Sequence, residues 1–124
     1  MIKCNIVLDT KIWIKKIKKP DNYFKLKLKK LSKFHFFRKK NHEFTILLTN
    51  NNKMKKLNLK FRNKNKITDV LSFPLKIKSK NKLYVGDIAI SFEIINKRSK
   101  SSFFDLEFDK MWIHGYLHLV GYDH

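Results

Sequence analysis

The segment from Asp105 to Val120 constrains this chain more than any other, because its residues are apolar on most sides of a helix. A helix of this kind is stable in water only when other parts of the protein cover it. Gly121 comes next, and glycine readily takes the left-handed conformation that ends a helix. The sequence therefore predicts a buried C-terminal helix that ends at Gly121.

Four other segments have the composition and alternation of β-strands. Residues 2–6 alternate apolar and polar side chains, as in a half-buried strand. Three further runs are apolar or rich in strand formers, at residues 43–49, 69–74 and 84–91. We expect Pro74 to end the third strand. A lysine-rich loop, of a length that suits a long hairpin, would join it to the fourth.

Two segments have the apolar spacing of amphipathic helices. The first follows Pro20, and its inner face is predicted to comprise Phe24, Leu28, Leu31 and Phe34. The second follows the asparagine cluster 50–52, and its inner face is predicted to comprise Met54, Leu57 and Phe61. Together with the strands, these helices predict an α+β fold. We expect one domain over residues 1–124, with helices packed on a mixed four-stranded sheet.

The chain carries a strong positive charge, since 29 Lys and Arg against 10 Asp and Glu give a net charge of +19. A hydrophobic content of 43% is too high for a disordered polycation, so we expect a globular domain with a basic exterior. Such an exterior attracts polyanions, with nucleic acid the first candidate and an anionic membrane surface the second. Lys, Asn, Ile and Phe are all abundant, so AT-rich coding is an alternative source of part of the charge.

The compartment is indicated by two simple features. Cys4 is the only cysteine, which excludes an intrachain disulfide and gives no sign of an oxidising compartment. No apolar run approaches the length of a membrane span. We therefore expect a soluble, cytoplasmic protein with no membrane partner.

Three histidines near the C-terminus have the spacing of a metal site. His114 and His118 are four residues apart, so on a helix their imidazoles project from one face and can share one ion. A chain reversal at Gly121 would bring His124 to the same ion as a third ligand. Three imidazoles leave a coordination position open for water, which is typical of a catalytic zinc site.

Two alternative interpretations of these histidines remain. The helical pair could simply pack in the core, with the third histidine at a frayed end. The same spacing also occurs in metzincin proteases, but a glutamate follows their first histidine where this chain has Gly115, so a metalloprotease is a minor alternative. His35 and His42 lie in a lysine-rich region without a ligand-like partner, and we expect both to be surface histidines.

Three blocks of the sequence resemble the YbeY family. The run HGYLHLVGYDH, from His114 to His124, is similar to the family signature HGxLHLxGYDH at every fixed position. A second block runs from Leu57 to Pro74 and includes Arg62 and the run TDVLSFP. The third is the run GDI at residues 86–88. The blocks stand in the family's order and span most of the chain from about residue 43 onward.

This resemblance implies a zincin-like metallohydrolase domain with its metal site at the end of the buried C-terminal helix. It implies a zinc-dependent endoribonuclease that prefers single-stranded RNA. Its role would be 16S ribosomal RNA 3′ end maturation and ribosome quality control, with the small ribosomal subunit as partner. It also implies one Zn²⁺ held by His114, His118 and His124, and a functional arginine at Arg62.

A hydrolytic mechanism follows as a hypothesis. Zinc would activate a water molecule, and Arg62 would bind the scissile phosphate and offset the charge of the transition state. Asp87 and Asp123 are candidates to orient a ligand histidine, with capping or structural roles as the alternative for each. A second class of function also stays open, namely a catalytically silent ribosome-associated RNA-binding protein whose metal is structural.

Overall fold

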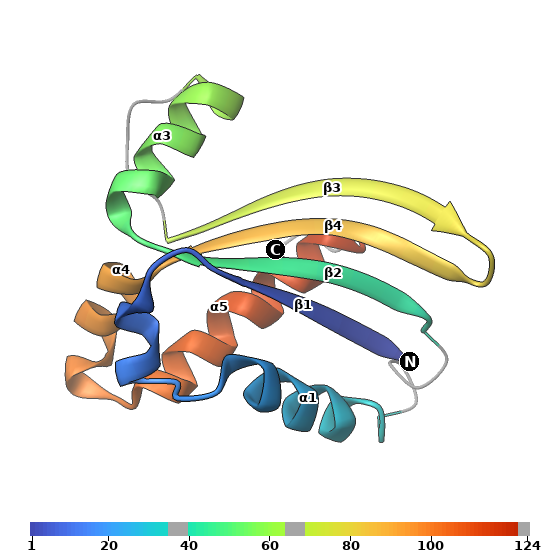
Figure 1. The fold of residues 1–124 in the computed structure, drawn as a ribbon, viewed down its shortest axis with the longest axis horizontal. Coiled ribbons are helices and arrows are strands. Elements are labelled where there is room, and N and C mark those ends of the chain that lie inside the picture. The colour runs from blue at the N-terminus through green and yellow to red at the C-terminus, as the bar shows by residue number, and fades with distance from the viewer. Residues whose placement is uncertain (35–39, 64–68, 122–124) are drawn as a thin grey trace.

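The structure is a computed structural model, and it describes residues 1–34, 40–63 and 69–121 (Figure 1). Strands are labelled β, α-helices α and short 3-10 helices η. The elements follow one another as β1 (Ile2–Leu8), η1 (Lys11–Lys15), α1 (Pro20–Leu31), β2 (His42–Thr49), α3 (Asn51–Arg62), β3 (Val70–Ser79), β4 (Lys82–Ser91), α4 (Phe92–Arg98), η2 (Ser99–Ser101) and α5 (Phe104–Leu119).

The four strands form one mixed sheet in the order β1-β2-β4-β3. β1 runs parallel to β2, and β2 runs parallel to β4. β3 pairs with β4 in the antiparallel sense, so a hairpin forms one edge of the sheet. The predicted α+β fold with a mixed four-stranded sheet is confirmed.

The main apolar core lies between one face of the sheet and helices α1, α4 and α5 (Figure 1). Alternate residues of the two central strands point into this core: Phe44, Ile46, Leu48, Ile88 and Ile90. The helices add large side chains: Phe24, Phe92, Phe108, Trp112 and Tyr116. η1, which the sequence did not predict, adds the fully buried Trp13, whose Nε1 donates to the carbonyl of Thr49 at 2.9 Å.

Helix α3 packs on the opposite face of the sheet. Met54 of α3, Leu71 of β3 and Ala89 of β4 are buried together, with Leu47 and Leu57 against them. Figure 1 shows that α3 stands at the end of the sheet away from the β3–β4 turn and projects from it. The two faces of the sheet therefore carry different helices, and α3 covers only part of its face.

Strand β3 continues beyond Pro74, so the prediction that this proline ends the strand was wrong. Proline lacks an N–H, but β3 is an edge strand, and a bulge between Pro74 and Ile77 accommodates the missing donor. Lys76 in this bulge has a φ of 58°. The strand then reaches Ser79 and turns back through residues 80–81. Most of the predicted lysine-rich loop is therefore β-hairpin.

Two aromatic residues predicted on inner helix faces are exposed instead. α1 ends at Leu31, so Phe34 lies beyond the helix and is 62% exposed. Phe61 is 57% exposed, because the last turn of α3 projects from the sheet. Its ring lies edge-on to that of Phe73, with 5.5 Å between centroids. The buried residue in this part of α3 is Asn58.

Helix α5 ends as the sequence predicts. Gly121 follows it with a φ of 99°, and its N–H donates to the carbonyl of His118 at 3.2 Å. The burial predicted for this helix is also confirmed by its position in the core. Among the described residues, neither α5 nor any other helix is long and apolar enough to cross a membrane.

Candidate metal centre

Helix α5 carries two of the three predicted metal ligands, His114 and His118. Its sheet-facing side is set by Trp112, Tyr116 and Leu119, all buried in the core. His114 is exposed and His118 is half-buried. Because they are four residues apart on a continuous helix, their imidazoles leave α5 on the same side about one turn apart. The structure therefore brings this pair together as expected.

Two glycines allow α5 to lie close to β4. A Cβ atom at Gly115 would lie 3.1 Å from the side chain of Ile88. A Cβ atom at Gly86 would lie 2.3 Å from the carbonyl oxygen of Phe73 and 2.9 Å from Cδ2 of Leu119, and the φ of Gly86 is 142°. The glycine beside His114 thus fixes how closely the histidine-bearing helix approaches the sheet. It also leaves little room for the glutamate that a metzincin protease carries at this position.

The edge strand β3 is hydrogen-bonded to the same part of α5. Ser72 Oγ donates to the carbonyl of Gly115 at 3.4 Å. Asp69, just before β3, forms an ion pair with Arg98 of α4 at 2.6 Å. The described part of the run TDVLSFP therefore holds β3 against α4 and against α5, which carries the histidine pair.

The two histidines have the donor chemistry of a divalent-metal site. Nδ1 of His118 is shielded from solvent, and a neutral imidazole can bind a metal ion through either ring nitrogen. Within residues 1–34, 40–63 and 69–121, no group of three or more His, Cys, Asp or Glu side chains is arranged to hold a metal ion. The third predicted ligand, His124, lies outside these residues, as do Asp123 and His35. The described chain thus supplies two of the three expected ligands.

Asp87 lies on the other face of the sheet from the histidine pair. The next residue, Ile88, packs toward Gly115 of α5, and successive side chains of a strand point to opposite faces. The hydroxyl of Tyr84 donates to Asp87, and the hydroxyl of Thr45 lies 2.5 Å from the same tyrosine oxygen. Burial, followed by the hydrogen bond to Asp87, raises the pKa of Tyr84 to about 12. Asp87 therefore belongs to a polar cluster and is not placed to orient either histidine.

Arg62 lies in the last turn of α3 and is exposed. The next residue, Asn63, ends the helix in the left-handed conformation with a φ of 54°. Because α3 and α5 pack on opposite faces of the sheet, the edge strand β3 separates Arg62 from the histidine pair. The structure thus presents the arginine to solvent but does not bring it against the two ligands.

His42 is not the surface histidine that the sequence led us to expect. It is half-buried at the start of β2, and its Nδ1 lies 2.8 Å from the hydroxyl of Tyr116 on α5. Burial, together with the positive charges of Lys40 and the N-terminal amino group, lowers the pKa of His42. The sequence did contain a signal for this burial. His42 lies two residues before Phe44, so both side chains point to the face of β2 that meets the core.

The fold and the site define an α+β protein with two histidines one turn apart on a buried helix. The chain matches the family model Endoribonuclease YbeY over residues 9–124. It is 48% identical over 130 residues to Endoribonuclease YbeY of Pelagibacter ubique, covering 100% of this chain and 84% of the relative. It is 39% identical to that of Thermodesulfovibrio yellowstonii, covering 90% and 72%. The chain belongs to the YbeY endoribonuclease family.

A solved structure has a similar fold. The solution structure of TM1509 from Thermotoga maritima matches with a TM-score of 0.59 and 26% sequence identity, over 100% of this chain and 75% of that one. The family match and the similar relatives confirm the resemblance inferred from the three sequence blocks. Membership of the family also gives the class of activity. The relatives are named endoribonucleases, and a ribonuclease is a hydrolase.

Proposed function

We propose that this chain is a zinc-dependent endoribonuclease that cleaves single-stranded RNA. Its role would be 16S ribosomal RNA 3′ end maturation and ribosome quality control in the cytoplasm, with the small ribosomal subunit as partner. The observation that carries the proposal is the pair His114 and His118 on successive turns of α5, in a chain of the YbeY endoribonuclease family. A zincin-like metallohydrolase arrangement is part of the same proposal.

The metal would be held by His114, His118 and His124. When bound, zinc would supply Lewis-acid chemistry for phosphodiester hydrolysis. The chain's own contribution begins with rigidity, since Gly115 and Gly86 seat α5 against β4 and so fix the backbone that carries both helical ligands. Ligands held in this way bind an ion without first losing conformational freedom.

Arg62 would bind the scissile phosphate and offset the negative charge that grows in the transition state. Its guanidinium has a planar fork that can grip two phosphate oxygens at once. Arg62 is exposed on α3, so its side chain has to reach past the β3 edge of the sheet to bind the same phosphate as the metal. The active site on this proposal includes groups from both faces of the sheet.

The decisive experiment is cleavage of a single-stranded RNA by purified protein with and without chelator. We expect cleavage in the untreated protein, loss of cleavage with chelator, and recovery when zinc is added back. His118→Ala is the matched variant and should not recover with zinc. Cleavage that persists at full rate in metal-free protein would exclude the zinc-dependent mechanism.

A second candidate is a catalytically silent RNA-binding protein with a structural metal. The observation that favours it is the concentration of lysines around the cavity at the hairpin end of the sheet. The same experiment separates the two. RNA binding that is unaffected by chelator, without cleavage under any metal condition, indicates the binding protein.

A further inference from the structure

The hairpin end of the sheet contains a cavity that the proposed hydrolysis does not use. Its volume is about 400 Å³. Its walls are Lys40, Asn41 and His42 on one side, and Lys78 with residues 80–83 of the hairpin on the other. Four of these eight lining residues are lysines and none is acidic. A cavity with such walls suits an anion.

The backbone around the cavity is held by hydrogen bonds. Nδ2 of Asn41 donates to the carbonyl of Asn81 in the hairpin turn at 2.6 Å, and the N–H of Leu83 donates to the carbonyl of Asn41 at 3.0 Å. Lys78 lies opposite Leu83 in the β3–β4 ladder. The lysines are therefore presented by a fixed frame, which lowers the entropy cost of ligand binding.

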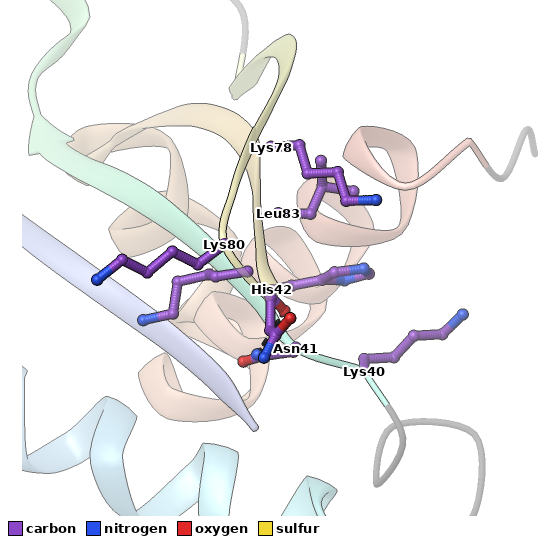
Figure 2. Close-up of a pocket in the computed structure, with 8 residues that line it drawn as sticks. Lys40, Asn41, His42, Lys78, Lys80 and Leu83 are labelled. Atoms are coloured by element: carbon purple, nitrogen blue, oxygen red, sulfur yellow. Dashed lines mark hydrogen bonds between the residues drawn. The ribbon is translucent and has the colours of Figure 1, made fainter.

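The lysines of this cavity differ in their ion pairs. Lys82 forms an ion pair with Glu43 at 3.3 Å. No ion pair with a described residue is recorded for Lys78 or Lys80. Figure 2 shows Lys40 and Lys78 extending to one side of the hairpin and Lys80 to the other. Lys40 and Lys78 therefore present positive charge on one side of the hairpin, and Lys80 presents it on the other side.

The cavity is joined directly to the helix of the histidine pair. Nδ1 of His42 in the cavity wall lies 2.8 Å from the hydroxyl of Tyr116. Tyr116 is two residues from both His114 and His118 on α5. Figure 2 shows the side chain of His42 extending to the same side as Lys40 and Lys78. A polyanionic chain that occupies this side of the hairpin therefore lies on the side of the cavity that contacts α5, the helix of the histidine pair.

We propose that Lys40 and Lys78, assisted by Lys80 and Lys82, form a second RNA-binding site that holds backbone phosphates of single-stranded RNA beside α5, the helix that carries the histidine pair. The inference rests on the proposed function. Ammonium groups act as point charges for phosphate oxygens, so the site grips the strand without reading its bases. It retains and positions the substrate, while the histidine pair and Arg62 carry the chemistry.

The test compares two double variants that remove equal charge. Lys40→Gln with Lys78→Gln changes the cavity. Lys97→Gln with Lys100→Gln is the control, since both lysines are exposed at the α4 end of the sheet, far from the hairpin turn (Figure 1). Binding of a fluorescently labelled 12-nucleotide oligouridylate is measured by anisotropy across a salt series, with chelator present so that no cleavage occurs. Circular dichroism establishes that both variants are folded.

We expect the cavity variant to bind the RNA about tenfold more weakly than the control variant at low salt. Its log-log salt slope should be shallower by about 1.4, because each lost phosphate contact on a single strand contributes about 0.7. Equal weakening in the two variants overturns the proposal, as does a cavity variant that binds the RNA as tightly as the unmodified protein. RNA binding is measured without metal, so it tests the second site even if the protein shows no zinc-dependent cleavage.

Discussion

His118 is one of the two proposed metal ligands in the described part of the chain, and its loss should lower metal binding. His118→Ala would leave only two of three imidazoles, and a two-ligand site loses both geometry and chelate advantage. We expect the zinc content per chain, measured by elemental analysis, to fall well below that of the unmodified protein. His35→Ala is the control and should retain zinc. Equal zinc content in the two variants would remove His118 from the site.

Arg62 provides a separate test at the level of a single residue. Arg62→Ala should keep zinc and the fold but lose cleavage rate on the order of a hundredfold, because a charge-stabilising contact in the transition state is removed. Arg62→Lys keeps the charge without the planar fork and should recover only part of the rate. Lys97→Ala measures the effect of removing one exposed cation elsewhere. If Arg62→Ala cleaves as fast as Lys97→Ala at full zinc occupancy, Arg62 has no catalytic role.

His42 should make the stability of the protein depend on pH. Its pKa is lowered in the folded state, chiefly by burial and then by Lys40 and the N-terminal amino group. The unfolded chain, with a pKa of about 6.5 at this residue, therefore binds more protons as the pH falls. The stabilisation is fully present above about pH 6.5 and is lost as the pH drops through the folded-state pKa.

Urea denaturation in the presence of chelator measures this effect. We expect the free energy of unfolding to fall more steeply from about pH 7.5 to about pH 5.5 in the unmodified protein than in His42→Gln, which has no imidazole to protonate. The other histidines are common to both proteins, so their contributions cancel in the comparison. Parallel pH profiles would show that His42 titrates equally in the folded and unfolded chains.

Single residues also show the limits of the sequence analysis. The spacing of His114 and His118 predicted their placement on one helix, because helical geometry alone relates residues four apart. The burial of His42 was missed because Lys39 and Lys40 come shortly before it and suggested an exposed segment. Only the pairing of β2 with its neighbouring strand shows that His42 belongs to the strand. The placement of Arg62 across the β3 edge depends on how α3 packs, which local sequence does not determine.

At the scale of elements, the contact between α5 and β4 should be sensitive to the size of two residues. Gly86→Ala requires a Cβ atom 2.3 Å from the carbonyl of Phe73 at a φ of 142°, so both backbone strain and overlap oppose it. Gly115→Ala meets only the side chain of Ile88 at 3.1 Å and also gains about 1 kcal/mol of helix propensity. Overpacking of a core commonly costs about 1–3 kcal/mol.

We therefore expect Gly86→Ala to lower the free energy of unfolding more than Gly115→Ala. Denaturant unfolding of the two variants gives the comparison. Adding Ile88→Val to Gly115→Ala should restore part of any loss, because it removes a methyl group from the contact. The reverse order of the two glycine variants would mean that α5 does not rest on β4 at these points.

Helices and strands could be predicted where the apolar pattern and the length of a segment indicated the same type of element. α5 and the four strands followed from periodicity, since a buried helix and half-buried strands leave different repeats in a sequence. β3 was predicted too short, because a proline within a central strand removes a ladder hydrogen bond but is tolerated at an edge. Whether a strand lies at the edge is a property of the sheet order, and local sequence does not contain it.

At the scale of the whole molecule, the net charge of +19 should govern RNA affinity. Binding of single-stranded RNA should weaken steeply as salt rises, with a log-log slope of about −0.7 for each phosphate contacted. Titrations of metal-free protein with labelled RNA at several salt concentrations give this slope. A slope near zero would mean that the lysines reflect the coding bias of the genome rather than a binding surface.

The irregular course of β3 has a consequence for the behaviour of the protein in concentrated solution. An edge strand offers unpaired backbone groups that can recruit a strand from another molecule and begin aggregation. Along this edge, Pro74 lacks one donor and the bulge at Lys76 interrupts the regular spacing of the others. The neighbouring lysines add charge repulsion between approaching copies. The residues that made β3 hard to recognise as a strand therefore also protect the protein from edge-to-edge self-association.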